Sequence, residues 1–282
     1  MTEATERNPS RTALTTAWLR AAHQILDAPP RILDDTVALR LLGEAAEQRI
    51  REDAKRYGAA AALALRAHVV LRSRFAEDRL EEAVRRGVTQ FVLLGAGLDT
   101  FALRQPAWSS PLRIVEVDHA ATQQMKHDWL SAAGLALPGN VAFAPIDFER
   151  ESLHAGLARH GVPLEAPTFF SWLGVTMYLN EAAIDATLAS IARFPPGSEV
   201  VLTFLQPAAT GQAAAGLAER VANAGEPFVS RFTPQALTEK LRAAGFGTVG
   251  LLEPEEAAAR YFASRPADLP LPRKAEIAWA IR

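Results

Sequence analysis

The sequence predicts an α/β fold in which helices cover both faces of a mostly parallel sheet. Short apolar runs that end in turn residues recur from residue 89 onward, as expected of buried parallel strands. Stretches with helical spacing of apolar residues separate most of these runs. Strands that alternate with helices are typical of a doubly covered parallel sheet. The fold class is therefore α/β, Rossmann-like.

Individual elements follow from the same patterns. Helical spacing predicts N-terminal helices over 12–26, 34–50 and 58–86, and later helices over 119–133, over 180–193 and from Thr233 onward. The predicted strands, seven in all, are 89–97, 113–118, 141–148, 167–175, 199–205, 247–253 and 276–282.

These elements form one predicted domain, 1–282. Residues 1–88 are its N-terminal helical extension, or cap, and residues 89–282 its core. Residues 206–232 interrupt the alternation and are predicted to be a lid-like insertion. Residues 254–275, which contain four prolines, are predicted to be irregular.

Composition limits the classes of function. The 282 residues are 49% hydrophobic and 22% charged, a balance that excludes a disordered chain. The absence of cysteine excludes a disulfide framework, a thiol nucleophile and a cysteine-ligated zinc site. No histidine and carboxylate cluster has metal-ligand spacing, so no metal is expected.

Charge and hydropathy predict the compartment and the partners. A net charge of −2 implies no broad basic surface for nucleic acid. No apolar run reaches the roughly 20 residues that span a membrane, and residues 1–11 lack the apolar core of a signal peptide. We therefore expect a cytoplasmic protein that binds neither nucleic acid nor membranes. The sequence does not predict an oligomeric state.

A glycine loop follows the first predicted strand, where ligands bind in open α/β sheets. Gly95, Ala96 and Gly97 would let the backbone approach a ligand closely, although a bare tight turn is the alternative. Thr100 stands where a dinucleotide fingerprint has glycine or alanine, and Asp99 adds negative charge. Both features favour a ligand without phosphates, such as S-adenosylmethionine.

Acidic residues end the next two predicted strands. Asp118 is placed to accept hydrogen bonds from ribose hydroxyls, or else it is a solvated strand-end aspartate. Asp147 and Phe148 suit an adenine pocket, in which the carboxylate accepts from the exocyclic amine and the ring packs on Phe148. For Asp147 the alternative is a helix N-cap.

Five segments carry a family resemblance. They are SRTALTTAWLRAAHQILDAPPRILDD, LRSRFAEDRLEEAVRRGVTQFVLLGAGLDTFALR, VEVDH, FFSWLGVTMYL and GEPFVSRFTPQAL. In this order, from Ser10 to Phe246, they resemble the leucine carboxyl methyltransferase family. The resemblance is strongest to its bacterial branch of O-methyltransferases associated with polyketide biosynthesis.

The resemblance implies a class I methyltransferase fold that binds S-adenosylmethionine. The family's arginine falls on Arg72, which would bind the methionine carboxylate of the cofactor. The glycine loop, the ribose acid and the adenine-side pair fall on Gly95–Gly97, Asp118, and Asp147 with Phe148. Eukaryotic members have a glutamate where this chain has Leu173, so backbone carbonyls of Gly95 or Ser171 are expected to meet the cofactor's amino group instead.

The expected reaction is methyl transfer to a carboxylate or a hydroxyl of a small molecule. A carboxylate needs no general base at pH 7, whereas a hydroxyl needs one, for which His23 is the candidate. Arg20 or Arg74 could pair with an acceptor carboxylate, and Tyr178 could line the acceptor pocket or pack in the core.

Three alternatives stay open. One is methylation of a protein's C-terminal carboxyl group, as the resemblance to the eukaryotic members implies. Another is a catalytically silent module that only binds the cofactor. The third, a dinucleotide-dependent reductase, is disfavoured by Thr100.

Overall fold

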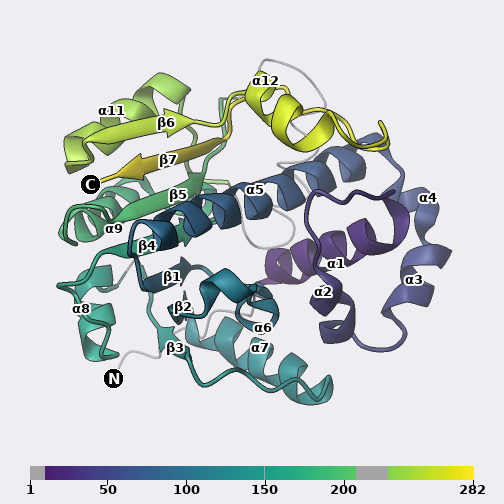
Figure 1. The fold of residues 1–282 in the computed structure, drawn as a ribbon, viewed down its shortest axis with the longest axis horizontal. Helices are drawn as coiled ribbons and strands as arrows, with labels where there is room; N and C mark the ends of the chain where they lie inside the picture. The colour runs from purple at the N-terminus through teal and green to yellow at the C-terminus, as the bar shows by residue number, and fades with distance from the viewer. Residues whose placement is uncertain (1–9, 149, 208–227) are drawn as a thin grey trace.

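A central sheet organises the molecule in the computed structural model, which describes residues 10–148, 150–207 and 228–282 (Figure 1). Within these ranges the sheet has seven strands in the order β3-β2-β1-β4-β5-β7-β6. All pairings are parallel except those of β7, which runs antiparallel to β5 and β6. The strands are β1 Gln90–Leu94, β2 Arg113–Asp118, β3 Val141–Pro145, β4 Thr168–Trp172, β5 Glu199–Thr203, β6 Thr248–Leu251 and β7 Ile277–Ile281. The predicted mostly parallel, seven-stranded α/β fold is confirmed.

Side chains that alternate along the strands divide the core between two faces. In β1, Phe91 and Leu93 pack with α5 (Ala60–Arg85) and with η3 (Ala258–Phe262). Val92 and Leu94 pack on the opposite face with α8 (Leu153–Arg159), α9 (Glu181–Ile191) and α11 (Pro234–Ala244). Helices therefore cover both faces, which explains why the strands are apolar runs without a polar face. The remaining helices of the core are α6 Phe101–Arg104, η1 Ala107–Ser109, α7 Ala120–Ala132, η2 Thr176–Tyr178 and α12 Pro254–Ala257.

The N-terminal helices form a cap beside the carboxyl ends of the parallel strands (Figure 1). They are α1 Arg11–Leu26, α2 Thr36–Leu41, α3 Ala46–Glu52 and α4 Ala54–Tyr57. A third apolar cluster joins α1, α2 and α3 to Leu98 in the loop after β1 and to Leu130 of α7. The single helix predicted over 34–50 is wrong: Gly43, with a φ of +88°, separates α2 from α3. A left-handed residue ends a helix, because the next turn cannot continue from it.

Two further segments, 206–232 and 254–275, were predicted to depart from the regular alternation of strands and helices. Most of the predicted lid, 206–232, lies outside the described residues. Its described end packs on η2, where Val229 N donates to Met177 O at 2.7 Å and Ser230 N donates to the same oxygen at 3.3 Å. The segment 254–275, expected to be irregular, instead begins with α12 and η3, because Pro254 occupies the first helical turn, which has no need of its missing N–H.

Candidate cofactor and acceptor site

The candidate site lies where the strand order reverses. β1 pairs with β2 on one side and with β4 on the other, so the loops after β1 and β4 flank a crevice at the carboxyl edge of the sheet. Gly95, after β1, has a φ of +69°, and a Cβ there would lie 2.3 Å from Cγ2 of Val175, after β4. The two loops are therefore in direct contact, and only glycine allows this approach.

Arg72 reaches this crevice from α5. A Cβ on Gly174 would lie 2.6 Å from Nη1 and 2.8 Å from Nη2 of Arg72, so the guanidinium lies against the loop after β4. Arg72 has no hydrogen bond or ion pair to any described residue, and its Nε is buried. Burial, helped by the nearby charge of Arg20, lowers the pKa of Arg72 to about 10. The charge of Asp99 opposes this shift, but no ion pair joins Asp99 to Arg72. Because a desolvated cation without an ion-pair partner is costly, this position fits a carboxylate.

Asp118 braces the glycine loop from the end of β2. Its Oδ2 accepts from Gly97 N at 2.6 Å, and its Oδ1 accepts from His119 N at 2.7 Å. Burial raises the pKa of Asp118. Each carboxylate oxygen keeps a second lone pair. Asp118 can therefore hold the loop and still accept hydrogen bonds from the hydroxyls of a ligand.

Asp147 and Phe148 follow β3, next to Asp118, whose carbonyl accepts from Ile146 N at 3.0 Å. Asp147 Oδ2 lies 4.0 Å from His119 Nε2, and the Phe148 ring centroid lies 6.4 Å from that of Trp172. A hydrogen-bond acceptor thus stands beside an apolar ring. These are the two features that the predicted adenine pocket needs.

Ser171 and Leu173 belong to β4 and the loop after it. Ser171 is buried and pairs in register with Leu93 of β1, so it lies beside the start of the glycine loop. Leu173 is half-buried and packs against the apolar cluster of α5. The position of the family's glutamate is therefore filled by an apolar contact.

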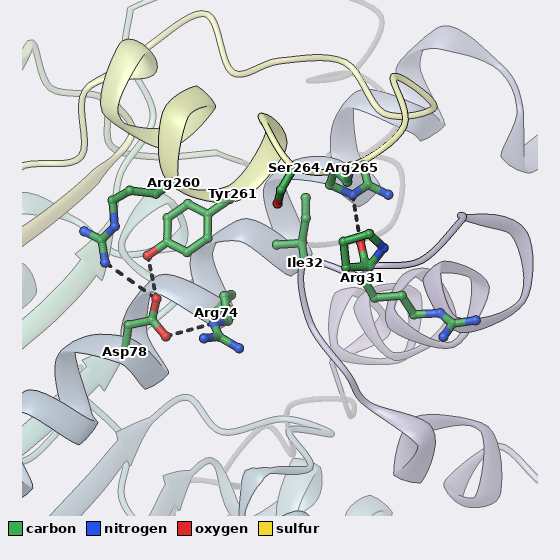
Figure 2. Close-up of a pocket in the computed structure, with 9 residues that line it drawn as sticks. Arg31, Ile32, Arg74, Asp78, Arg260, Tyr261, Ser264 and Arg265 are labelled. Atoms are coloured by element: carbon green, nitrogen blue, oxygen red, sulfur yellow. Dashed lines mark hydrogen bonds and ion pairs between the residues drawn. The ribbon is translucent and has the colours of Figure 1, made fainter.

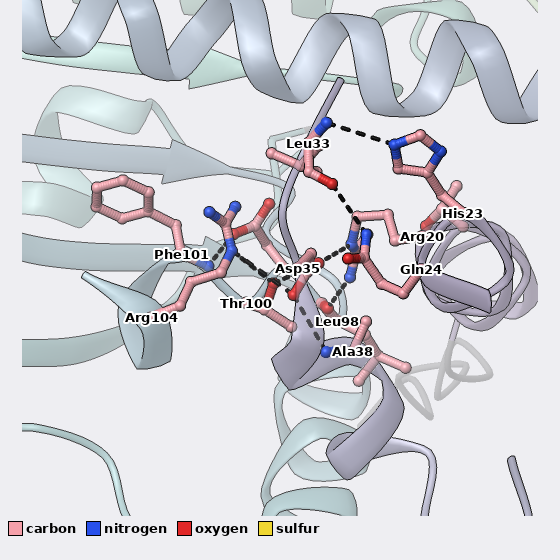
Figure 3. A network of polar contacts seen from close by, with 12 residues as sticks. Arg20, His23, Gln24, Leu33, Asp35, Ala38, Leu98, Thr100, Phe101 and Arg104 are labelled. Atoms are coloured by element: carbon pink, nitrogen blue, oxygen red, sulfur yellow. Dashed lines mark hydrogen bonds and ion pairs between the residues drawn. The ribbon is translucent and has the colours of Figure 1, made fainter. Parts of the chain in front are cut away.

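Arg20 and His23, both on α1, are engaged in contacts within the protein (Figure 3). Arg20 is buried and donates from Nε to Asp35 Oδ2 at 2.9 Å and from Nη2 to Leu98 O at 2.5 Å. His23 is fully buried, with Nδ1 2.7 Å from Asp27 Oδ2 and Nε2 accepting from Leu33 N at 3.4 Å. Both ring nitrogens of His23 are thus occupied, which argues against a role in proton transfer.

Tyr178 lies at the crevice. It belongs to η2 and is close enough to Arg72 for its charge to affect the pKa of that residue. The centroid of its ring is 5.6 Å from that of Phe228, in the segment that packs on η2. The structure therefore brings Tyr178 together with Arg72 and the glycine loop, whereas it places Arg20 and His23 within the cap.

His68 is a candidate that the sequence patterns did not single out. It precedes Arg72 by one turn of α5, so both side chains lie on one face of the helix. His68 makes no hydrogen bond to a described residue and is only partly buried. Burial, and then the charge of Arg72, lowers the pKa of His68 to about 3. A neutral imidazole next to Arg72 is thus open to a ligand, and the spacing of four residues could have indicated it.

A separate polar cavity of about 330 Å³ lies between residues 30–32, α5 and residues 260–265 (Figure 2). Most of the charged side chains that line it are paired with one another or with neighbouring residues. Asp78 accepts from Arg74 Nε and from the Tyr261 hydroxyl, each at 2.8 Å, and Arg265 Nη1 lies 2.9 Å from Asp268 Oδ1. Arg74 therefore belongs to this ion-pair network and lies apart from the crevice that contains Arg72.

The described residues include no group of three or more histidine, aspartate and glutamate side chains arranged to hold a metal ion. None of the helices in these ranges combines the length and apolar character needed to cross a membrane.

Comparisons with known proteins agree with this geometry. Residues 13–192 match the family model described as leucine carboxyl methyltransferase. Bacillus subtilis YktD, provisionally named an S-adenosyl-L-methionine-dependent methyltransferase, is 30% identical over 92% of this chain and 93% of its own. A Parafrankia protein with the same provisional name is 35% identical over 68% of this chain and 62% of its own. A crystal structure from Thermobifida fusca, provisionally named a methyltransferase, has a TM-score of 0.57 at 19% identity, over 86% of this chain and 91% of that one. This structural match shows a shared fold.

Proposed function

Because this chain belongs to the leucine carboxyl methyltransferase family, we propose that it is an S-adenosylmethionine-dependent enzyme that methylates an oxygen of a small molecule. The resemblance to this family in the sequence is thereby confirmed. The observation that carries the proposal is Arg72, which is half-buried, has a buried Nε without a hydrogen bond to a described residue, and lies with its guanidinium against Gly174 at the switch point of the sheet.

The described residues fit S-adenosylmethionine. Arg72 would bind the methionine carboxylate, which supplies the ion pair that no described residue makes. Gly95–Gly97 would let the backbone approach the cofactor, and Asp118 would accept hydrogen bonds from its ribose hydroxyls. Asp147 and Phe148 would hold the adenine. Leu173 leaves the amino group to neutral acceptors, for which the backbone carbonyls of Gly95 and Ser171 remain candidates.

The bound cofactor supplies an activated methyl group on a sulfonium, so the protein's task is to align the acceptor with it. An acceptor carboxylate is already ionised at pH 7 and needs no base. A hydroxyl acceptor would have to pass its proton to a neighbouring group. His68 is placed for this second route better than His23, because its imidazole has no hydrogen-bond partner among the described residues. Its lowered pKa makes it a weak base in the ligand-free protein, so this route needs the bound acceptor to raise that pKa.

We infer a carboxylate or hydroxyl acceptor, in keeping with the resemblance to the branch associated with polyketide biosynthesis. We propose that this acceptor is a secondary metabolite made in the cytoplasm. Two alternatives have specific support. Family membership favours methylation of a protein's C-terminal carboxyl group. Leu173, in place of an acid, favours a module that binds the cofactor without turnover.

Calorimetric titration of S-adenosylhomocysteine tests the cofactor site. We expect micromolar binding by the wild type, no binding of NADPH, and a loss of about 5- to 150-fold in Asp118→Ala, which corresponds to about 1–3 kcal/mol for an abolished buried hydrogen-bond partner. A folded wild-type protein that does not bind S-adenosylhomocysteine would refute the proposal.

Transfer of labelled methyl groups to a panel of acids and phenols then tests the acceptor. Label on a small acid or phenol supports the proposed activity. Label only on a peptide that ends in a free carboxyl group supports the protein-directed alternative. Cofactor binding without label on any acceptor supports the silent module.

A further inference from the structure

One buried carboxylate, that of Asp35, joins the cap to the loop that follows β1 (Figure 3). Asp35 is the N-cap of α2, and its Oδ1 accepts from Ala38 N at 3.1 Å. Its Oδ2 accepts from Arg20 Nε at 2.9 Å and from the Thr100 hydroxyl at 2.7 Å. Asp35 is 0% exposed. Both oxygens therefore accept hydrogen bonds in a buried environment, where such bonds are strong.

Both partners of Oδ2 fix the glycine loop. Thr100 is buried and lies three residues after Gly97. Arg20 donates from Nη2 to Leu98 O at 2.5 Å. The loop is also in contact with α1 itself, because a Cβ on Gly97 would lie only 2.9 Å from the Cβ of Ala13. Asp35 thus holds residues 98–100 directly through Thr100 and indirectly through Arg20.

Charge makes this arrangement sensitive to the loss of Asp35. Arg104 Nε lies 3.6 Å from Asp35 Oδ1, and its Nη1 donates to Glu77 Oε2 at 2.9 Å. Burial alone would raise the pKa of Asp35, but the charges of Arg20 and Arg104 hold this pKa below its ordinary value. A neutral side chain at position 35 would leave the buried guanidinium of Arg20 and the partly buried one of Arg104 with one carboxylate, that of Glu77.

We propose that Asp35 is a positioning residue for the cofactor: it holds the glycine loop in register with the N-terminal cap, so that cofactor affinity depends on the cap. This inference rests on the proposed function, because it takes Gly95–Gly97 as the cofactor loop. It also explains Thr100, whose hydroxyl makes the contact and which stands where a dinucleotide loop has a glycine or alanine.

The chain offers a matched control in Asp27. Its side chain is also buried, and it accepts from Arg66 Nε at 2.8 Å and from Arg66 Nη2 at 2.7 Å. Its pKa is likewise held below the ordinary value, by His23 and Arg66 against the effect of burial. Asp27 joins α1 to α5 and makes no hydrogen bond to residues 95–100. Asp27→Asn therefore removes a comparable charge from the cap without affecting the loop directly.

The experiment compares calorimetric titrations of S-adenosylhomocysteine into the wild type, Asp35→Asn, Asp27→Asn and Thr100→Val, with the Tm of each protein. We expect both asparagine variants to lower Tm, but only Asp35→Asn to weaken binding, by about tenfold or more. Thr100→Val keeps the shape and removes only the hydroxyl, which donates to Asp35 and accepts from Arg104 Nε at 3.2 Å, so we expect a loss of about three- to tenfold.

Hydrogen exchange provides a readout that a merely structural role would not change. In the wild type and Asp27→Asn, the ligand should slow exchange in residues 36–52 of the cap, and in Asp35→Asn and Thr100→Val this protection should be lost. The inference is overturned if Asp35→Asn and Thr100→Val keep wild-type affinity, or if Asp27→Asn weakens binding as much as they do. If Asp35→Asn does not fold, Thr100→Val decides. A wild type that does not bind at all refutes the proposed function instead.

Discussion

Replacing Arg72 by methionine should make the ligand-free protein more stable while it removes cofactor binding. The guanidinium lies near the charge of Arg20 and makes no ion pair with a described residue, and the charge of Asp99 offsets only part of the cost of burial. The fall of the pKa of Arg72 to about 10 corresponds to about 3 kcal/mol of unfavourable free energy for the charged form, at about 1.4 kcal/mol per unit. Methionine has a similar length and no charge, so the variant should recover part of this.

The effects on stability and on affinity should have opposite signs. A gain of about 1 kcal/mol in the free energy of unfolding would raise Tm by about 2–4 °C in a chain of this size. Loss of a charge-assisted bond to the cofactor carboxylate should weaken S-adenosylhomocysteine by about 10- to 150-fold, or about 1.5–3 kcal/mol. Most substitutions in a binding site lower stability and affinity together. A variant that is more stable but binds more weakly would therefore identify the desolvated charge of Arg72 as the cause.

The assay combines thermal unfolding without ligand and calorimetry with two ligands. 5′-Methylthioadenosine lacks the amino acid part of the cofactor, so Arg72→Met should bind it as the wild type does. Arg72→Lys keeps the charge and should retain part of the affinity for S-adenosylhomocysteine. The reasoning fails if Arg72→Met lowers Tm, or if it binds S-adenosylhomocysteine with wild-type affinity.

Three further predictions concern the loop, the cap and α5. Gly97→Ala should lower the free energy of unfolding by about 1–3 kcal/mol in urea denaturation. The residue has a φ of +52°, and its Cβ would lie 2.9 Å from that of Ala13. An unchanged urea midpoint would contradict this close approach. Asp35 has a depressed pKa, so it stabilises the fold above its ordinary value of 3.8 and loses this effect as the pH falls through the folded-state value. The stability deficit of Asp35→Asn should therefore be constant above about pH 5 and shrink below pH 3.8; a deficit unaffected by acid would show that charge is not its cause. His68→Leu should keep S-adenosylhomocysteine binding but slow transfer to phenols by about 100-fold or more, with less effect on acids, whereas equal rates on phenols would exclude His68 as the proton acceptor.

The sequence predicted the sheet well because burial on both faces leaves a clear pattern. Each of the seven predicted apolar runs contains an observed strand, and the glycines that follow β1 lie at the crevice as expected. Errors arose where the pattern is not periodic. Gly43 divides the helix expected over 34–50, and its left-handed conformation is decided by the chain's path and not by local spacing. The prediction that residues 254–275 are irregular gave too much weight to their four prolines.

The site was less predictable, because its charged residues depend on partners far away in the chain. Arg72 could be placed through the family resemblance, yet its lack of a counter-ion is visible only in the structure. His23 was a candidate base as a lone histidine on a cap helix, but Asp27 and Leu33 occupy its ring nitrogens. The contact of Asp35 with Thr100, 65 positions later, has no local signal at all.

The antiparallel strand β7 has a consequence for the order of folding. It pairs with both β5 and β6, and β6 has no other neighbour among the described strands. During synthesis β6 therefore emerges without a partner and joins the sheet only when residues 277–281 follow it. The parallel strands β1 to β5, which have Gly95 and Asp118 at their carboxyl ends, need no later strand to pair with one another. The ligand-binding loops can thus assemble early on the ribosome, before β7 joins β6 to the other side of the sheet.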